Sequence, residues 1–320
     1  MRSTAWIAGL IVLALGGGLW YGLSGNSKPA APERVEVPLP PPSGSPSLLL
    51  PAPDPGLVED SPDGPLPIIG RDGRQPWQAY ARSFDRNDKR PRVALIISGL
   101  GLDRPLSQAA MDRLAGGVTL AFDPYAVGMK DVINQARSLG HETLLGLPME
   151  PADYPRQDPG PLTLLVSIGD AQNTARLKRL MGSGSGYVGM LALWGERFTA
   201  EKSALLPVLE ALKQRGLMYV DNKPPSGNTT VLLASQMKLP WDAADKYLDN
   251  DTDPAVIDQA LADSEILARR NGAAVVIAAL SPAIIDHATT WLATLENKGV
   301  ALAPASAVVG RQLLTATSAP

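Results

Sequence analysis

The stretch VALIISGLGLDRP, residues 93–105, places a run of apolar residues directly before a glycine-containing turn and the start of a helix. Its first five residues are aliphatic, as expected of a strand that is covered on both faces. Asp103 and Pro105 follow at positions where a helix N-cap and a proline of the first turn are favoured. A strand that leads into a capped helix is the repeating unit of parallel α/β folds.

The same unit recurs along the chain after Pro91. Six further apolar runs follow, with the sequences VTLAF, ETLLG, YVGMLAL, LMYVD, AAVVIAA and VALAP. The segments between them are amphipathic, begin at residues that favour helix N-termini and end at glycines, which favour helix C-termini. Seven strands that alternate with about six helices predict a parallel sheet buried on both faces, either an open doubly wound sheet or a barrel.

The first 69 residues have a different composition. Residues 5–23 form an uncharged apolar run behind Arg2, with Trp20 and Tyr21 at its far end, and such a run is long enough to span a bilayer. We therefore expect residues 1–24 to be a transmembrane anchor, with a cleaved signal segment as the alternative. Residues 25–69 carry 13 of the 30 prolines and predict a disordered linker. The globular domain is expected over residues 70–312, followed by a flexible tail at 313–320.

Charge and residue usage exclude several kinds of site. The formal net charge of -3 and the scattered Lys and Arg residues argue against nucleic acid as a partner. The chain has no cysteine, which excludes disulfides and thiolate metal sites, and only two histidines. His141 begins a predicted strand and is expected to form local hydrogen bonds. His287 flanks the buried face of a helix, so neither a shared metal site nor a Ser-His-Asp triad is expected.

Polar residues at the carboxyl ends of the predicted strands are the candidates for a binding site, because parallel α/β folds place their chemistry there. The candidate residues are Glu150, Trp194, Glu196, Arg197, Asp221 and Asp249. The strand register of Trp194 is open, and core packing and sugar stacking are both possible for it. The acidic run DNDTDP, residues 249–254, partly resembles a calcium loop, but a helix cap at Asp253 explains most of it.

Taken together, several motifs resemble those of the divergent polysaccharide deacetylases of bacterial envelopes. The motifs are LPIIGRDGRQPWQAYAR, VALIISGLGLD, VTLAFDPYA, GHETLLGLPMEP, GYVGMLALWGERFT, YVD, YLDND and GAAVVIAALSP, between about Leu66 and Arg311. The resemblance implies a distorted (β/α) barrel of the glycoside hydrolase/deacetylase type with about seven strands. It also implies a bacterial inner-membrane location with most of the chain in the periplasm, or secretion to the periplasm if the first segment is cleaved.

The resemblance also shows where this chain departs from the family pattern. The family's metal ligands and acid/base groups are Asp-Asp after the first strand, His before Pro-Met-Glu, Asn-Asn-His in the fourth motif and His in a late Gly-His-Pro. The corresponding positions here are Ser98, Gly99, Gly146, Leu191, Ala192, Leu193 and Ala279. None of these residues supplies a carboxylate or an imidazole, so we expect no catalytic residues, no metal and no cofactor.

Three functions follow as hypotheses. The first is a membrane-tethered envelope protein with a catalytically degenerate domain that binds envelope glycan or a protein partner. The second is an active carbohydrate deacetylase, acting on polysaccharide or peptidoglycan, with a divalent cation held by oxygen ligands among the candidate residues. The third is a purely structural domain.

Overall fold

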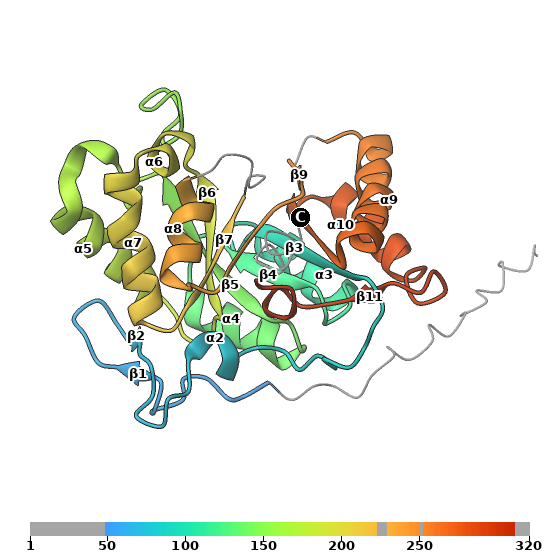
Figure 1. Ribbon diagram of the computed structural model, residues 1–320, viewed down its shortest axis with the longest axis horizontal. Coiled ribbons are helices and arrows are strands. Elements are labelled where there is room, and N and C mark those ends of the chain that lie inside the picture. Colours follow the sequence, from blue (N-terminus) through green and yellow to red (C-terminus); the bar gives the residue numbers. More distant parts are fainter. Residues whose placement is uncertain (1–48, 223–228, 250–251, 311–320) are drawn as a thin grey trace, which may run out of the picture. The chain divides into compact units, whose positions relative to one another are not determined.

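The computed structural model describes residues 49–222, 229–249 and 252–310 (Figure 1). The expected anchor at residues 5–23 and the expected tail at 313–320 lie outside these ranges. No helix within them is long and apolar enough to cross a membrane.

A curled sheet of eight parallel strands forms the centre of the domain, in the order β8-β7-β6-β5-β4-β3-β10-β9. The strands are β3 (Arg92–Leu100), β4 (Thr119–Phe122), β5 (Thr143–Met149), β6 (Gly189–Trp194), β7 (Met218–Asp221), β8 (Trp241–Ala243), β9 (Lys246–Leu248) and β10 (Ala273–Ala279). β11 (Ala301–Leu302) pairs with β3 off this path. All seven predicted strands are present, which confirms the parallel α/β fold. β8 and β9 are additional.

One short segment supplies both edges of this sheet. β8 pairs with β7 at one edge and β9 pairs with β10 at the other, yet only Ala244 and Asp245 separate them. Three residues of extended chain span at most about 10 Å, so the sheet must curl until its edges approach each other. The backbone N–H of Asp245 donates to Val275 O at 2.8 Å, and that of Ala244 donates to Asp221 O at 3.0 Å. The curled sheet agrees with the expected barrel-like architecture.

The helices lie between the strands, and three of them begin at a capping side chain that the sequence predicts. They are α3 (Arg104–Arg113), α4 (Met129–Ser138), α5 (Gly169–Met181), α6 (Glu196–Ala200), α7 (Lys202–Gln214), α8 (Thr229–Met237), α9 (Pro254–Asn271) and α10 (Pro282–Leu292). Asp103, Asp253 and Ser281 accept the N-terminal backbone N–H groups of α3, α9 and α10. The cap at Asp253 confirms the helix-start interpretation of the acidic run.

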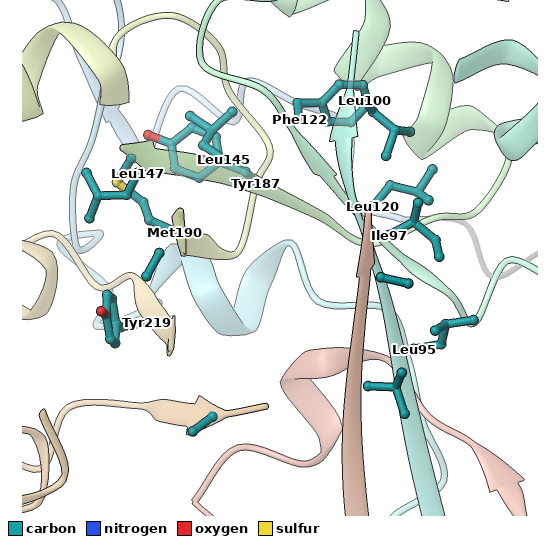
Figure 2. Packing of buried hydrophobic residues seen from close by; sticks show 14 of the residues in the cluster. Leu95, Ile97, Leu100, Leu120, Phe122, Leu145, Leu147, Tyr187, Met190 and Tyr219 are labelled. Carbon is teal, nitrogen blue, oxygen red and sulfur yellow. The ribbon is translucent and has the colours of Figure 1, made fainter. Parts of the chain in front are cut away.

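The buried residues form two hydrophobic clusters, one on each face of the sheet. Leu95, Ile97, Leu120, Phe122 and Met190 belong to the cluster that packs against the helices, and Figure 2 shows this packing. Their strand neighbours belong to the second cluster, which fills the concave face and contains Ala94, Ile96, Ala121, Leu144, Leu191, Val220, Val275 and Ile277. This alternation follows from the two-residue period of a strand. Side chains along a strand therefore face the helices and the concave interior of the sheet in turn.

The segment at residues 49–90 covers the amino ends of the strands. It contains β1 (Val58–Glu59), β2 (Leu66–Pro67) and α2 (Pro76–Ala79), and it buries Leu57 and Tyr80 completely. The predicted linker at 25–69 therefore extends too far, because residues 49–69 are part of the folded domain. The apolar side chains between the prolines supply the buried surface that a linker lacks.

Candidate functional site

The concave face of the sheet continues beyond its apolar core to the carboxyl ends of the strands, which we call the mouth. The two-residue alternation carries the interior series from Ile96 to Ser98, from Leu144 to Gly146, from Leu191 to Leu193 and from Ile277 to Ala279. Ala279 and Ser98 are register partners on adjacent strands. The structure thus brings four of the sequence-predicted ligand positions together on one surface.

Apolar side chains occupy the place where a side chain at Gly146 would lie. A Cβ at this glycine would come within 2.6 Å of Leu193 Cδ1 and 3.0 Å of Pro124 Cδ, and within 3.2 Å of the backbone oxygen of Phe122. All three distances are shorter than ordinary van der Waals contact. Glycine at 146 and leucine at 193 are therefore complementary in shape.

The donor groups at the mouth do not suit a divalent ion. Among residues 49–222, 229–249 and 252–310, no group of three His, Asp or Glu side chains lies close enough to share a metal ion. The Ser98 hydroxyl donates to Ala278 O at 3.4 Å and is buried. A catalytic zinc site requires three protein ligands with one open position, and these side chains do not provide them.

Asp123 lies at the mouth but was not among the candidate residues chosen from the sequence. It follows β4 directly, it is buried, and its Oδ1 accepts the backbone N–H of Tyr125 at 2.9 Å. Burial raises the pKa of the Asp123 carboxyl, and the hydrogen bond from Tyr125 opposes this shift only in part. A carboxylate between an apolar run and a proline was the signal in the sequence that could have singled it out.

Glu150 is a buried junction between loops rather than an open side chain at the rim. Its Oε2 accepts the Val166 N–H at 2.6 Å, and its Oε1 lies 3.1 Å from Arg197 Nη1. Its backbone oxygen accepts the N–H groups of Arg197 and Phe198. Glu150 is only 2% exposed. Its contacts hold the loop after β5 against the start of α6.

Trp194 lies at the end of β6 in the left-handed region, with φ of 56°. Non-glycine residues in this conformation cost free energy and occur preferentially at functional sites. The side chain is half-buried. With the Gln157 amide oxygen turned toward the indole, Trp194 Nε1 donates to it at 2.9 Å. Asn222 Nδ2 donates to the Trp194 backbone oxygen at 3.2 Å, so contacts from two loops hold this residue.

The other candidates are dispersed around the mouth. Glu196 and Arg197 are exposed on α6, and Asp249 is exposed and accepts the Thr252 hydroxyl at 2.8 Å. Asp221 is buried, and its neighbour Val220 belongs to the concave face, so the Asp221 side chain points toward the helix side. The structure does not bring the four acids together as one ligand set.

Both histidines have the local roles that the sequence predicted. His141 is buried, with Nδ1 2.9 Å from Val118 O and Nε2 3.1 Å from Met111 O. Burial lowers the pKa of His141, which favours the neutral ring. His287 Nδ1 lies 2.6 Å from Asp258 Oδ1 on the outer helix layer.

Comparison with known proteins identifies the family. The sequence model of the divergent polysaccharide deacetylases matches residues 95–309, about two thirds of the chain. The chain belongs to the divergent polysaccharide deacetylase family. This confirms the resemblance that the motifs indicated.

The chain is also similar to two further proteins. The uncharacterized protein YibQ of Escherichia coli K12 is 24% identical over 195 residues, which cover 61% of this chain and 60% of YibQ. The crystal structure of the uncharacterized protein ATU2773 from Agrobacterium tumefaciens C58 superposes with a TM-score of 0.74 at 36% sequence identity. That match covers 77% of this chain and all of the other. The similarity to ATU2773 supports the curled-sheet architecture described above.

The contact between Gly146 and Leu193 yields a stability prediction. Gly146→Ala is expected to lower the free energy of unfolding by about 1–3 kcal/mol, because the added methyl group overpacks a filled site. Leu193→Ala removes the nearest contact, so the double variant should recover part of this loss. Urea unfolding of the four proteins of the cycle measures the coupling free energy. Additive single effects would contradict the direct contact.

Proposed function

We propose that this member of the divergent polysaccharide deacetylase family is a membrane-tethered envelope protein whose domain binds envelope glycan at the mouth without catalysing deacetylation. The observation that carries the proposal is the apolar contact of Leu193 and Pro124 over Gly146. In the family pattern this is a ligand position. A glycine covered by a leucine can neither bind an ion nor transfer a proton.

The chemistry of deacetylation supports the same conclusion. Hydrolysis of an acetamide by this class of enzyme uses a divalent ion to polarise the carbonyl and to acidify a water molecule, together with an acid/base group. The side chains on the concave face do not fit such an ion. Asp123 remains as an isolated carboxyl, and one carboxyl alone does not replace a three-ligand site.

The mouth retains features that suit binding of a sugar. Trp194 is partly exposed and is held in a strained conformation, while Leu193 and Pro124 provide an apolar surface near the Asp123 carboxyl. Small-molecule sites combine an apolar lining with a few oriented polar groups. The Trp194 N–H is already engaged by Gln157, so the indole would contribute its flat face, which can stack on the apolar face of a sugar.

The membrane part of the proposal depends on residues 5–23. Their length, lack of charge and terminal aromatic pair are typical of a single-pass anchor, with most of the chain in the periplasm. A protein partner instead of a glycan is the remaining form of the binding hypothesis.

The test combines an activity assay with a binding assay on the full chain. Acetylated chitooligosaccharides and peptidoglycan fragments are incubated with the protein, with and without zinc, cobalt, magnesium or calcium. We expect no acetate release, but we expect saturable binding that Trp194→Ala weakens about tenfold. Trp77→Ala is the matched control, because Trp77 lies in α2 at the other end of the strands. Acetate release that depends on an added metal would instead establish the active deacetylase.

A further inference from the structure

Basic side chains gather on the face formed by the amino ends of β3 and β10, at the opposite end from the mouth. Three of them precede β3 in the segment that leads into it, one begins β3, and the end of α9 and the turn after α10 contribute the rest. This basic face consists of Arg86, Lys89, Arg90, Arg92, Arg269, Arg270 and Lys298. All except Arg92 are exposed.

Direct contacts hold these segments side by side. The Arg92 N–H donates to Gly272 O at 3.0 Å, which fixes the lead-in against the end of α9. The Arg269 guanidinium donates to Lys298 O at 2.5 Å and joins α9 to the turn that follows α10. The Arg92 guanidinium donates to the backbone oxygens of Arg86 and Asp88, at 3.4 and 3.2 Å. Figure 1 shows the lead-in passing beside the end of α9.

Acidic residues neutralise this basic face only in part. Arg90 pairs with Asp88 at 2.7 Å, and Lys298 pairs with Glu265 at 2.7 Å. Asp85 and Glu296 are the other two carboxylates in these segments, so the basic face carries an excess of three positive charges although the whole chain is at -3. Such a concentration of positive charge on an acidic protein attracts anionic surfaces.

Leu50, near the start of the folded domain, also lies at this end of the strands. The backbone oxygen of Leu50 accepts a hydrogen bond of 2.6 Å from Arg137 Nη2, next to the amino ends of β5 and β6. The linker therefore joins the domain at the end that carries the basic face.

We propose that the basic face docks on the anionic lipid headgroups of the membrane that holds the chain, so that the mouth points away from the bilayer. This inference rests on the proposed membrane tether. Each Lys or Arg near an anionic leaflet contributes to the attraction, which fades beyond a Debye length. A docked domain presents its glycan-binding mouth to the envelope polymer rather than to the lipid.

The test uses the absence of cysteine from the chain. Asn87→Cys places a fluorescent label on the basic face, and Val127→Cys places it at the mouth, where Val127 is 72% exposed. The full-length variants are reconstituted into vesicles of phosphatidylglycerol and phosphatidylcholine or of phosphatidylcholine alone, each with a lipid-borne quencher. We expect strong quenching only for the Asn87 label in anionic vesicles at low salt.

Charge reversal provides the matched comparison. One variant combines three charge reversals on the basic face, Arg86→Glu, Lys89→Glu and Arg270→Glu. It should lower the ratio of docked to undocked domain by at least about 100-fold. Lys130→Glu, Arg156→Glu and Lys202→Glu change the net charge equally at the other end and should have little effect. Equal quenching of both labels, or equal quenching in both lipids, would overturn the inference. The vesicles are washed with alkaline carbonate only after the quenching has been measured, because this wash removes proteins that do not span the bilayer. Loss of the chain in the wash would contradict the membrane tether but would leave the docking result standing.

Discussion

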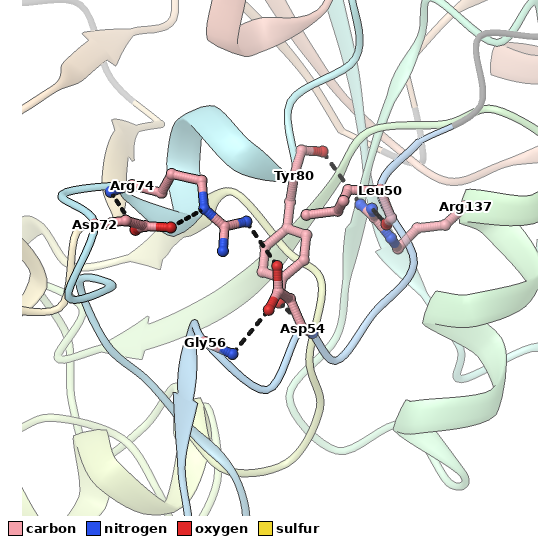
Figure 3. A network of polar contacts seen from close by, with 7 residues as sticks. All are labelled: Leu50, Asp54, Gly56, Asp72, Arg74, Tyr80 and Arg137. Atoms are coloured by element: carbon pink, nitrogen blue, oxygen red, sulfur yellow. Dashed lines mark hydrogen bonds and ion pairs between the residues drawn. The ribbon is translucent and has the colours of Figure 1, made fainter.

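Arg137→Ala is expected to lower the free energy of unfolding by about 3–5 kcal/mol. Arg137 lies in the last turn of α4 but is only 6% exposed. Its guanidinium donates to the backbone oxygens of Gly186 at 2.5 Å, Leu50 at 2.6 Å and Tyr80 at 3.2 Å. Figure 3 shows the contacts with Leu50 and Tyr80, which join the segment at residues 49–90 to α4. Alanine would leave two buried carbonyl groups and one part-buried carbonyl group without this donor.

The charge and the ring contact of Arg137 add to the expected loss. Burial lowers the pKa of Arg137 to about 10, so the side chain still carries its charge at neutral pH. The guanidinium carbon lies 5.1 Å from the centre of the Tyr80 ring, which permits a cation–π interaction. The expected effect is large because one substitution removes the hydrogen bonds and the ring interaction at the same time.

Chemical denaturation followed by circular dichroism measures the effect of Arg137→Ala. Arg113→Ala is the matched control, because Arg113 is 48% exposed in its side chain and pairs with an exposed carboxylate, Asp286. Such a surface pair contributes at most about 1 kcal/mol. If both variants lost the same small amount of stability, the buried network would not be a main stabilising contact.

Glu142→Ala is expected to lower the free energy of unfolding by a similar amount, about 3–5 kcal/mol. The Glu142 side chain is fully buried and accepts hydrogen bonds from three parts of the chain. The Arg82 N–H donates to it at 3.1 Å, the Ser306 N–H at 2.9 Å and the Thr119 hydroxyl at 3.4 Å. The Ser306 hydroxyl donates to the same carboxylate. Removing it would leave one buried donor and three part-buried donors without their acceptor at once.

Two further variants separate the causes of this effect. Glu142→Gln keeps the shape of the side chain but only one of its two acceptor oxygens. We therefore expect it to lose stability, but less than Glu142→Ala loses. Glu210→Ala removes an exposed glutamate of α7 and should change stability by less than about 0.5 kcal/mol. Burial raises the pKa of Glu142, although its donors oppose this. If Glu142→Ala and Glu210→Ala changed the free energy of unfolding by similar amounts, the Glu142 carboxylate would not be what holds these segments together.

The strands and helices followed from local features of the sequence. The aliphatic runs of β3, β5 and β10 predict buried parallel strands, and Asp103, Asp253 and Ser281 predict the helix starts at which the structure places them. β8 and β9 were missed because each has three residues and their segment contains charged side chains. Their strand conformation depends on pairing with β7 and β10, which are distant along the chain.

The candidate site was predictable in part. The motif spacing indicated the positions that meet at the mouth, because carboxyl ends of parallel strands share one edge of a sheet. The sequence did not reveal that Leu193 covers Gly146, that Glu150 is buried between loops, or that Trp194 adopts a left-handed conformation. These features arise from contacts between β5, β6 and the loops that follow them.

By itself, the sequence determined the fold class, the family and the substitution of the expected ligands, because periodicity, caps and motifs are local properties of the chain. Only the tertiary structure decided which polar side chains are buried. Arg137 and Glu142 resemble ordinary surface residues at a helix end and a strand start, yet each joins segments far apart in the sequence. The reason is physical: burial and hydrogen-bond partners depend on which segments pack together, and a single sequence does not encode that in any short window.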